Sequence, residues 1–134
     1  MKSRIRSVIP KKIVGINISP QKRDVISEIA KSENAEAEFF GSEVSAQQVG
    51  YLCGFKGFER SEKVGEDIAD ECLIFSGIDS RSLDPILKKL REKGAAVELK
   101  AIVTAHNQSW NVGELIKELR REHLHMNGGD SGEK

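Results

Sequence analysis

The stretch that decides the fold is CLIFSGID at residues 72–79. Its four leading apolar residues have the length and composition of a buried strand. The Ser-Gly-Ile-Asp that follows is typical of a turn into a helix that Asp79 caps. The helix then carries four apolar residues on one face, namely Leu83, Ile86, Leu87 and Leu90. Gly94 predicts its end. Since Pro85 cannot lie deep in a helix, the regular part should begin no earlier than about Arg81.

The first half of the chain shows the same order of elements with weaker signals. We expect a strand at 13–18, a helix that Ser19 caps, and a second strand at 37–40. The S-x-x-Q pattern at 45–48 has the form of a capping box, which predicts a second helix to about Cys53.

The second half continues with a strand at 97–104 and a helix with apolar residues Val112, Leu115, Ile116 and Leu119. Strands that alternate with helices predict a small three-layer α/β domain, (βα)4, with a mostly parallel four-stranded sheet in the order 2-1-3-4. Residues 49–52 also resemble 112–115, and 18–19 resemble 78–79, which suggests a βαβα duplication. The inferred helix caps disagree by three residues under this alignment, so the sequence alone leaves the duplication open.

A chain of 134 residues is long enough for one packed core. We therefore expect a single α/β domain at 13–125. In chain order the expected parts are a basic flexible arm at 1–12, a half-domain at 13–55, a charged linker at 56–71, a half-domain at 72–125 and a disordered tail at 126–134.

The composition argues against several classes of protein. Lys plus Arg and Asp plus Glu number 21 each, so no net charge draws in a polyanion, and a nucleic-acid role loses support. No apolar run approaches the ~20 residues of a membrane-spanning helix, and no signal peptide is recognisable. The two cysteines, Cys53 and Cys72, have apolar neighbours and are expected to be buried thiols in a reducing compartment. We therefore expect a cytoplasmic protein without a membrane association.

The predicted order 2-1-3-4 suggests where a ligand would bind. If strands 1 and 3 lie side by side and point the same way, their loops diverge and open a crevice at the carboxyl end of the sheet. Asn17 and Ser19 leave strand 1, and Ser76 and Gly77 leave strand 3. Two helix N-termini would face this crevice, which favours a small anionic ligand, although Asp79 would repel it. The alternative is that these residues only cap helices and form turns.

The most distinctive stretch is LKAIVTAHNQSW at residues 99–110. With 75–77, Leu115 and the pair Glu122-His123, it resembles a family of small bacterial proteins catalogued only as a domain of unknown function. The resemblance covers about 72–123 and depends on the spacing of Lys100, Thr104, Asn107, Trp110 and the pair Glu122-His123. The resemblance implies no activity, cofactor or functional residue.

The residues of this stretch allow two interpretations. Asn111 and Glu114 can form a capping box, which gives the preceding Trp110 a structural role. Lys100 lies in an apolar strand that order 2-1-3-4 places at the edge of the sheet, where a lysine discourages aggregation. Alternatively, Lys100 lies near Thr104 and Asn107 and binds an anion.

Other reactive groups do not combine into a known site. His123 and His125 lie two residues apart and point in different directions on a helix, so no metal site is predicted. A nucleophilic Cys–His pair would need Cys53 or Cys72 beside His106. Both cysteines are expected in core elements, where burial raises the pKa of the thiol and removes its reactivity. The chain has no nucleophile elbow, phosphate-binding loop or dinucleotide fingerprint. We therefore assign no catalytic residue, metal or cofactor.

Three function classes remain, and the sequence favours the first. It is a non-catalytic binding or regulatory module that recognises a small anionic ligand or a protein partner. The second is a small enzyme for a phosphorylated or carboxylated metabolite, which requires Lys100, Thr104, Asn107 and Ser76 to converge. The third is nucleic-acid binding through the basic arm, which otherwise is a solvated terminus. The sequence does not predict the oligomeric state.

Overall fold

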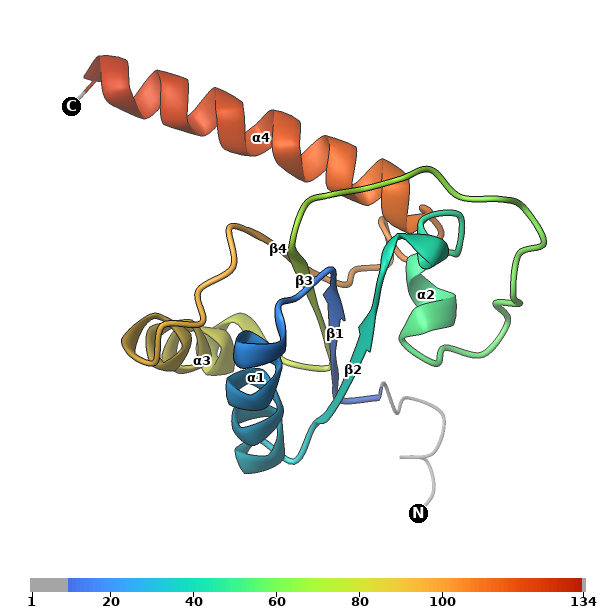
Figure 1. The fold of residues 1–134 in the computed structure, drawn as a ribbon, viewed down its shortest axis with the longest axis horizontal. Helices are drawn as coiled ribbons and strands as arrows, with labels where there is room; N and C mark the ends of the chain where they lie inside the picture. Colours follow the sequence, from blue (N-terminus) through green and yellow to red (C-terminus); the bar gives the residue numbers. More distant parts are fainter. Residues whose placement is uncertain (1–9, 134) are drawn as a thin grey trace.

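A computed structural model of the protein describes residues 10–133, with side chains as far as Glu122 (Figure 1). The first half contains β1 (Lys12–Ile16), α1 (Pro20–Ser32), β2 (Glu36–Phe40), the 3-10 turn η2 (Ser42–Val44) and α2 (Val49–Leu52). The second half contains β3 (Cys72–Ser76), α3 (Ser80–Glu92), β4 (Leu99–Ile102) and α4 (Val112–Glu133). Most of the predicted basic arm and the side chains of the predicted tail lie outside the described residues, so both stay predictions.

The four strands form one sheet in the order β2-β1-β3-β4, which confirms the predicted α/β fold and strand order. β1 pairs with β2 and β3 pairs with β4 in parallel, whereas β1 and β3 are antiparallel. Helices α1 and α3 cover one face of the sheet, and α2 and α4 cover the other (Figure 1). None of the helices in the described part of the chain has the length and apolar character needed to cross a bilayer.

Alternation along the strands sends successive side chains into two separate cores. Ile13 packs with α1 and α3, whereas its neighbour Val14 packs with α2 and α4. In β3, Leu73 and Phe75 belong to the first core and Ile74 to the second. All five residues of β3 are buried, because helices cover both faces of the sheet.

The two halves are built alike. α1 and α3 each have 13 residues, and each follows a strand through a residue with positive φ, Asn17 (58°) or Gly77 (70°). Asn34 (58°) and Gly94 (73°) repeat this equivalence after the helices. The connection to the next strand spans 33–35 in the first half and 93–98 in the second. These three extra residues account for the three-residue shift between the match of 18–19 with 78–79 and that of 49–52 with 112–115, and they support the duplication.

The helix predicted from residue 45 to Cys53 is wrong in its start, because α2 begins only at Val49. Residues before it are held by the second half instead: Gln48 forms an antiparallel bridge with Asn111, and the Val49 N–H donates to the Trp110 carbonyl at 2.9 Å. The predicted capping box therefore does not form, and Ser45 Oγ donates to the Glu66 carbonyl at 2.9 Å.

Two boundaries in the second half also differ from the sequence predictions. The strand predicted at 97–104 is limited to Leu99–Ile102, because Val103 is the last residue that bonds to β3, through its N–H and the Phe75 carbonyl. The helix α3 begins at Ser80, so Pro85 lies in its second turn. The proline costs the bond to the Arg81 carbonyl, one turn earlier, and the helix continues.

The charged linker contains a segment, residues 59–71, that we call the strap. It forms neither helix nor strand and passes from α2 over the start of α4 to β3 (Figure 1). Three of its carboxylates form ion pairs with helices, Glu66 with Lys117, Asp70 with Arg120, and Glu71 with Lys22. The linker is therefore a fixed part of the domain surface.

Candidate functional site

The crevice predicted between β1 and β3 does not exist, and this prediction was wrong. Because the two strands are antiparallel, Ile16 at the carboxyl end of β1 pairs with Cys72 at the amino end of β3. Asn17 and Ser19 therefore lie at one end of the sheet, and Ser76 lies at the opposite end. The helices that follow these strands do not share a site.

At the first end, groups of the chain itself occupy the predicted ligand contacts. The Ser19 N–H at the start of α1 donates to the Glu71 carboxylate at 3.2 Å, and Glu71 also pairs with Lys22 at 2.6 Å. The Asn17 amide donates to the carbonyls of Ile68 (2.6 Å) and Asp70 (3.1 Å). A carboxylate of the strap thus takes the anion position at this helix N-terminus.

At the second end, the predicted site residues also have structural partners. Ser76 is buried, and its Oγ donates to the Pro10 carbonyl at 2.8 Å. Gly77 has the positive φ that the turn into α3 requires. Asp79 caps α3 by accepting the Ser82 N–H at 2.8 Å, and this main-chain bond lowers the pKa of its carboxyl group.

Thr104 and Asn107 shape the loop after β4. The Asn107 side chain accepts the Thr104 N–H (2.9 Å) and donates to the Ile102 carbonyl (3.1 Å), while Thr104 Oγ1 accepts the N–H groups of His106 and Asn107. The predicted capping box at Asn111 is confirmed, because Glu114 N–H donates to Asn111 Oδ1 at 2.8 Å and the Asn111 N–H donates to Glu114 at 3.1 Å. Thr104 and Asn107 therefore follow β4 at the same end of the sheet as Ser76, where the Val103 N–H donates to the Phe75 carbonyl, and at the end opposite to Asn17 and Ser19. Their polar groups are used within the loop.

One predicted site residue, Lys100, lies at an apolar hollow. The hollow has a volume of about 340 Å³, and its wall is formed by Phe75, Leu83, Leu87, Lys100, Ala101 and Ile102. A second hollow of about 90 Å³ shares Leu87 and Lys100 with it and adds Leu90, Arg91, Ala96 and Val97. We call the two together the α3–β4 groove.

The groove exists because the two halves differ there. Helix α1 packs closely on β2, whereas α3 packs beside α1 and touches β4 little (Figure 1). The three extra residues at 93–98 allow this displacement. α3 also carries Leu83 and Leu87 where α1 has Arg23 and Ser27, so its wall of the groove is more apolar. At the equivalent position in β2, the small Ala37 takes the place of Lys100 and packs against the core.

Lys100 is the charged centre of this groove. Its Nζ donates to the carbonyls of Val97 (2.8 Å) and Glu98 (3.2 Å), so two of its three N–H groups are used. Desolvation lowers the pKa of Lys100; the Glu98 carboxylate opposes this shift, and the nearby Arg91 adds to it. Of the described side chains that line the two hollows, the charged ones are Lys100 and Arg91. The groove therefore presents positive charge beside apolar surface.

Sequence reasoning found Lys100 but missed the apolar wall. Leu83 and Leu87 share a helix face with Ile86 and Leu90, so helical periodicity alone does not separate the wall of a groove from the core. Both are half-buried, while Ile86 and Leu90 are buried. Aligning the two halves could have revealed them, because Arg23 and Ser27 at the matching positions of α1 show that the fold does not need leucines there.

The remaining reactive groups are inert in this geometry. Cys53 and Cys72 are free, buried thiols, and burial raises the pKa of Cys53 to about 11 and that of Cys72 to about 12. Among the described residues, no three His, Cys, Asp or Glu side chains lie close enough to hold a metal ion. The histidine pair near the chain end lies outside the described side chains.

Residues 71–126 match the model of a protein family described as a domain of unknown function (DUF3783). The match confirms the resemblance inferred from the sequence, and it covers β3, α3, β4 and the first part of α4, which is the half that contains the α3–β4 groove. No curated protein and no solved structure matches the chain.

Proposed function

We propose that the protein is a non-catalytic binding module whose α3–β4 groove recognises a carboxylate carried on an apolar group. The observation that carries this proposal is the placement of Lys100 in the wall of an apolar hollow of about 340 Å³. Two of its N–H groups donate to main-chain carbonyls, and Arg91, on α3, lines the smaller hollow together with Lys100. Either a small organic acid or a side chain of a protein supplies this chemistry.

The energies favour a ligand with both features. Covering apolar area contributes about 25 cal/mol per Å², so a ligand that covers ~100 Å² of groove wall gains about 2.5 kcal/mol. A charge-assisted hydrogen bond to the Lys100 ammonium adds ~1.5–3 kcal/mol. Desolvation destabilises the charged form of the Lys100 ammonium, and a carboxylate ligand restores part of this stabilisation. A neutral or cationic ligand does not.

The arrangement of polar groups favours binding over catalysis. An enzyme would need the groups at Ser76, Thr104, Asn107 and Lys100 to converge on one reacting atom. Lys100, Thr104 and Asn107 instead bond within their own strand or loop, and Ser76 donates to the Pro10 carbonyl. An acyl or phosphoryl transfer reaction would therefore lack a positioned nucleophile or base in the groove.

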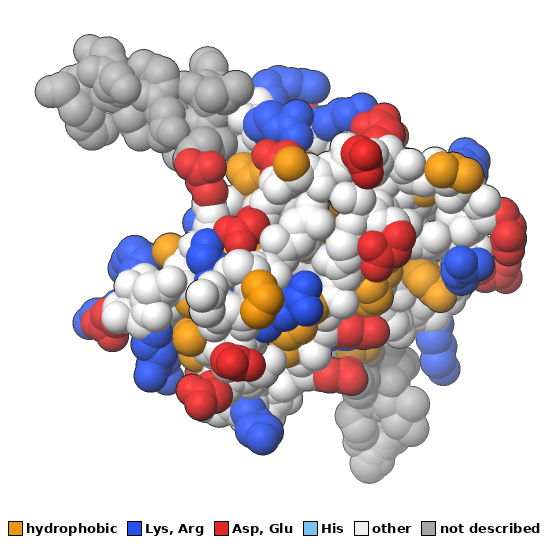
Figure 2. Space-filling model, in the orientation of Figure 1, with side chains coloured by type: hydrophobic (Ala, Val, Ile, Leu, Met, Phe, Trp, Pro, Cys, Tyr) orange, Lys and Arg blue, Asp and Glu red, His pale blue; other side chains and the backbone are white. Residues whose placement is uncertain are grey.

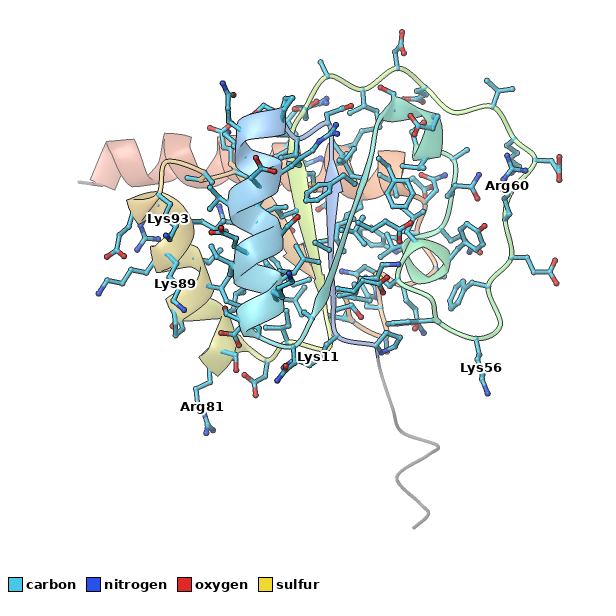
Figure 3. All side chains as sticks on the ribbon, turned by 60° about the horizontal axis from the view of Figure 1, so that its bottom comes forward. Lys11, Lys56, Arg60, Arg81, Lys89 and Lys93 are labelled. Atoms are coloured by element: carbon cyan, nitrogen blue, oxygen red, sulfur yellow. The ribbon has the colours of Figure 1, made fainter. Side chains whose placement is uncertain are left out.

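Dispersed charge favours a compact ligand over a nucleic acid. Side chains of both signs are interspersed on the visible face of the molecule (Figure 2). Arg81, Lys89 and Lys93 extend outward from α3, whereas Lys56 and Arg60 extend from the other side of the molecule (Figure 3). A protein that binds the backbone of a nucleic acid needs a continuous basic stripe.

The two buried free thiols suit a reducing compartment, and we propose a bacterial cytoplasm.

A calorimetric titration with sodium nonanoate tests the proposal. We expect the wild type to bind nonanoate, and to bind nonylammonium at least ~10-fold more weakly, the factor that about 1.4 kcal/mol represents. Lys100→Met should weaken nonanoate binding by a similar factor, because it keeps an apolar side chain and removes the ammonium. Lys89→Met, on the outer face of α3, is the matched control and should bind like the wild type. Equal binding of the acid and the amine, or by Lys100→Met and the wild type, would contradict the proposal.

A further inference from the structure

We infer that the occupant of the α3–β4 groove is an extended segment of a partner protein that adds to β4 as a fifth strand. In this arrangement the segment places an apolar side chain in the groove and an Asp or Glu two residues later opposite Lys100. The inference rests on the proposed function and names the source of the carboxylate. It depends on the edge of β4, which the proposed function does not use.

The edge of β4 presents free main-chain groups. β4 is the last strand of the sheet, and its other neighbour is β3. The Val103 N–H donates to the Phe75 carbonyl at 2.9 Å, so by alternation the main-chain groups of Leu99 and Ala101 also face β3. Those of Lys100 and Ile102 face away from the sheet. Within the described residues, the N–H groups of both and the carbonyl of Lys100 make no hydrogen bond.

The two ends of this edge define its length. The Ile102 carbonyl already accepts the Asn107 side-chain amide at 3.1 Å, so pairing cannot continue into the loop. At the other end, the Lys100 ammonium occupies the carbonyls of Val97 and Glu98. Three main-chain groups remain for a partner, the N–H groups of Lys100 and Ile102 and the carbonyl of Lys100. This number suits a short extended segment. Asn107, predicted as a ligand contact, here marks the end of the docking edge.

Strand geometry then determines the side chains of the partner. A residue that exchanges both main-chain hydrogen bonds with Lys100 in antiparallel pairing points its side chain to the same face as Lys100, which is the α3 face. The residue two positions earlier lies opposite Ile102 and faces the apolar wall formed by Phe75, Leu83 and Leu87. An acidic residue opposite Lys100 is a favourable cross-strand pair. The expected motif is therefore apolar–any–acidic.

The opposite edge of the sheet lacks these features. β2 has exposed acidic residues at Glu36 and Glu38, and Glu38 pairs with Lys12 at 2.5 Å. α1 packs closely on this strand, whereas α3 touches β4 little. An acidic segment would meet like charge from Glu36 and Glu38 at β2, whereas at β4 the two cations Lys100 and Arg91 outnumber the one carboxylate of Glu98 beside them. Charge complementarity thus selects the β4 edge for this partner.

A synthetic peptide tests strand addition. The probe is the capped peptide Thr-Val-Thr-Ile-Thr-Glu-Thr, in which an isoleucine precedes the glutamate by two residues. We expect saturating peptide to slow amide hydrogen exchange at Lys100 and Ile102 by at least ~10-fold, while amides on the β2 edge keep their rates. The same peptide N-methylated at its glutamate cannot donate to the Lys100 carbonyl, and it should bind at least ~3-fold more weakly.

The outcomes separate this inference from the proposed function. If nonanoate binds and the peptide does not, or if the N-methylated peptide binds as well as its parent, strand addition is wrong and the proposed carboxylate site stands. If peptide binding slows exchange at the β2 edge instead of at β4, the assigned edge is wrong. If neither probe binds, both proposals fail.

Discussion

Val14 and Ile74 face each other at the centre of the sheet, and each is the counterpart of the other in the duplicated unit. Their pairing means that a pseudo-two-fold axis passes between β1 and β3, perpendicular to the sheet. The same axis passes between Gln48 and Asn111, another equivalent pair that forms a bridge. Hydrogen bonds around it are duplicated as well: the Val49 N–H donates to Trp110 and the Val112 N–H to Gln47, both at 2.9 Å.

This axis explains why the predicted crevice was wrong. A two-fold axis perpendicular to a sheet relates neighbouring strands that run in opposite directions, so equivalent strands pair as antiparallel neighbours. Each βαβ unit keeps its own parallel pair, as the right-handed crossover requires. The chain leaves β2 and enters β3 at the same end of the sheet, because Phe40 and Cys72 both pair with Ile16, and the connection between them contains α2 and the strap. The two halves of the chain therefore associate as two subunits of a dimer would.

The equivalent positions Asn111 and Gln48 predict different contributions to stability. Asn111 caps α4 through a reciprocal pair of bonds with Glu114, whereas the Gln48 side chain does not cap α2. Asn111→Ala should lower the free energy of unfolding by about 1 kcal/mol. The matched control Gln48→Ala should cost less than ~0.5 kcal/mol. Urea denaturation measures both, and equal losses would contradict the capping role of Asn111.

Local patterns predicted the elements of this fold better than their relationship. The run of residues 72–75 and the apolar face of α3 placed both elements correctly, because strand and helix periodicities depend on neighbouring residues. The direction of β1 relative to β3 depends on how the two halves dock, which no local pattern records. The late start of α2 has the same origin, since Gln48 pairs with Asn111, which lies 63 positions away in the chain.

The candidate site shows the same limit. Lys100 stood out as a charge in an apolar strand, and this was a local signal. The groove beside it arises from the displacement of α3 from β4 and from two leucines that a helix-face analysis assigns to the core. Asn17 and Ser76 each follow a strand, and this local pattern predicts that both line one crevice. The antiparallel pairing of the two strands places them at opposite ends of the sheet.

Gly15 is required because a side chain there would meet two others. A Cβ atom at this position would lie 2.7 Å from Ile18 Cγ1 and 2.7 Å from Phe39 Cδ1. Gly15→Ala should therefore lower the free energy of unfolding by ~1–3 kcal/mol. Adding Phe39→Leu should recover part of that loss, although Phe39→Leu alone destabilises. Thermal denaturation of the three variants gives the coupling, and additive effects would refute the proposed overlap.

The two thiols predict a reactivity that depends on unfolding. Because burial raises the pKa values of Cys53 and Cys72 to about 11 and 12, neither forms a thiolate at pH 8. A disulfide reagent such as Ellman's should label less than ~10% of the native protein within minutes and both thiols in denaturant. Rapid labelling of either cysteine in the native protein would show that its environment is open.

The ion pair between Asp70 and Arg120 predicts a pH-dependent contribution of the strap. The hydrogen bond from Arg120 holds the pKa of Asp70 below its usual value, so the stabilisation is complete above the unfolded-state pKa, about 3.9, and is lost as the pH falls through the lower folded-state pKa. Asp70→Asn should cost ~0.2–1 kcal/mol at pH 7, and this cost should shrink as the pH falls through the lowered pKa of Asp70. Glu62→Gln, in an exposed pair at 4.0 Å, is the control and should have no effect. A cost for Asp70→Asn that is independent of pH would contradict the assignment.

The most direct test of the account is to locate bound nonanoate on the protein by amide chemical shifts in a two-dimensional NMR titration. We predict that the largest shifts cluster at Leu83, Leu87, Lys100 and Ile102, and that Lys100→Met needs ~10-fold more nonanoate to reach the midpoint of the shifts at the groove residues, without altering the rest of the spectrum. Shifts that centre instead on Asn17 and Ser19 or on Ser76 and Gly77, with the α3–β4 groove unchanged, would contradict the central claim.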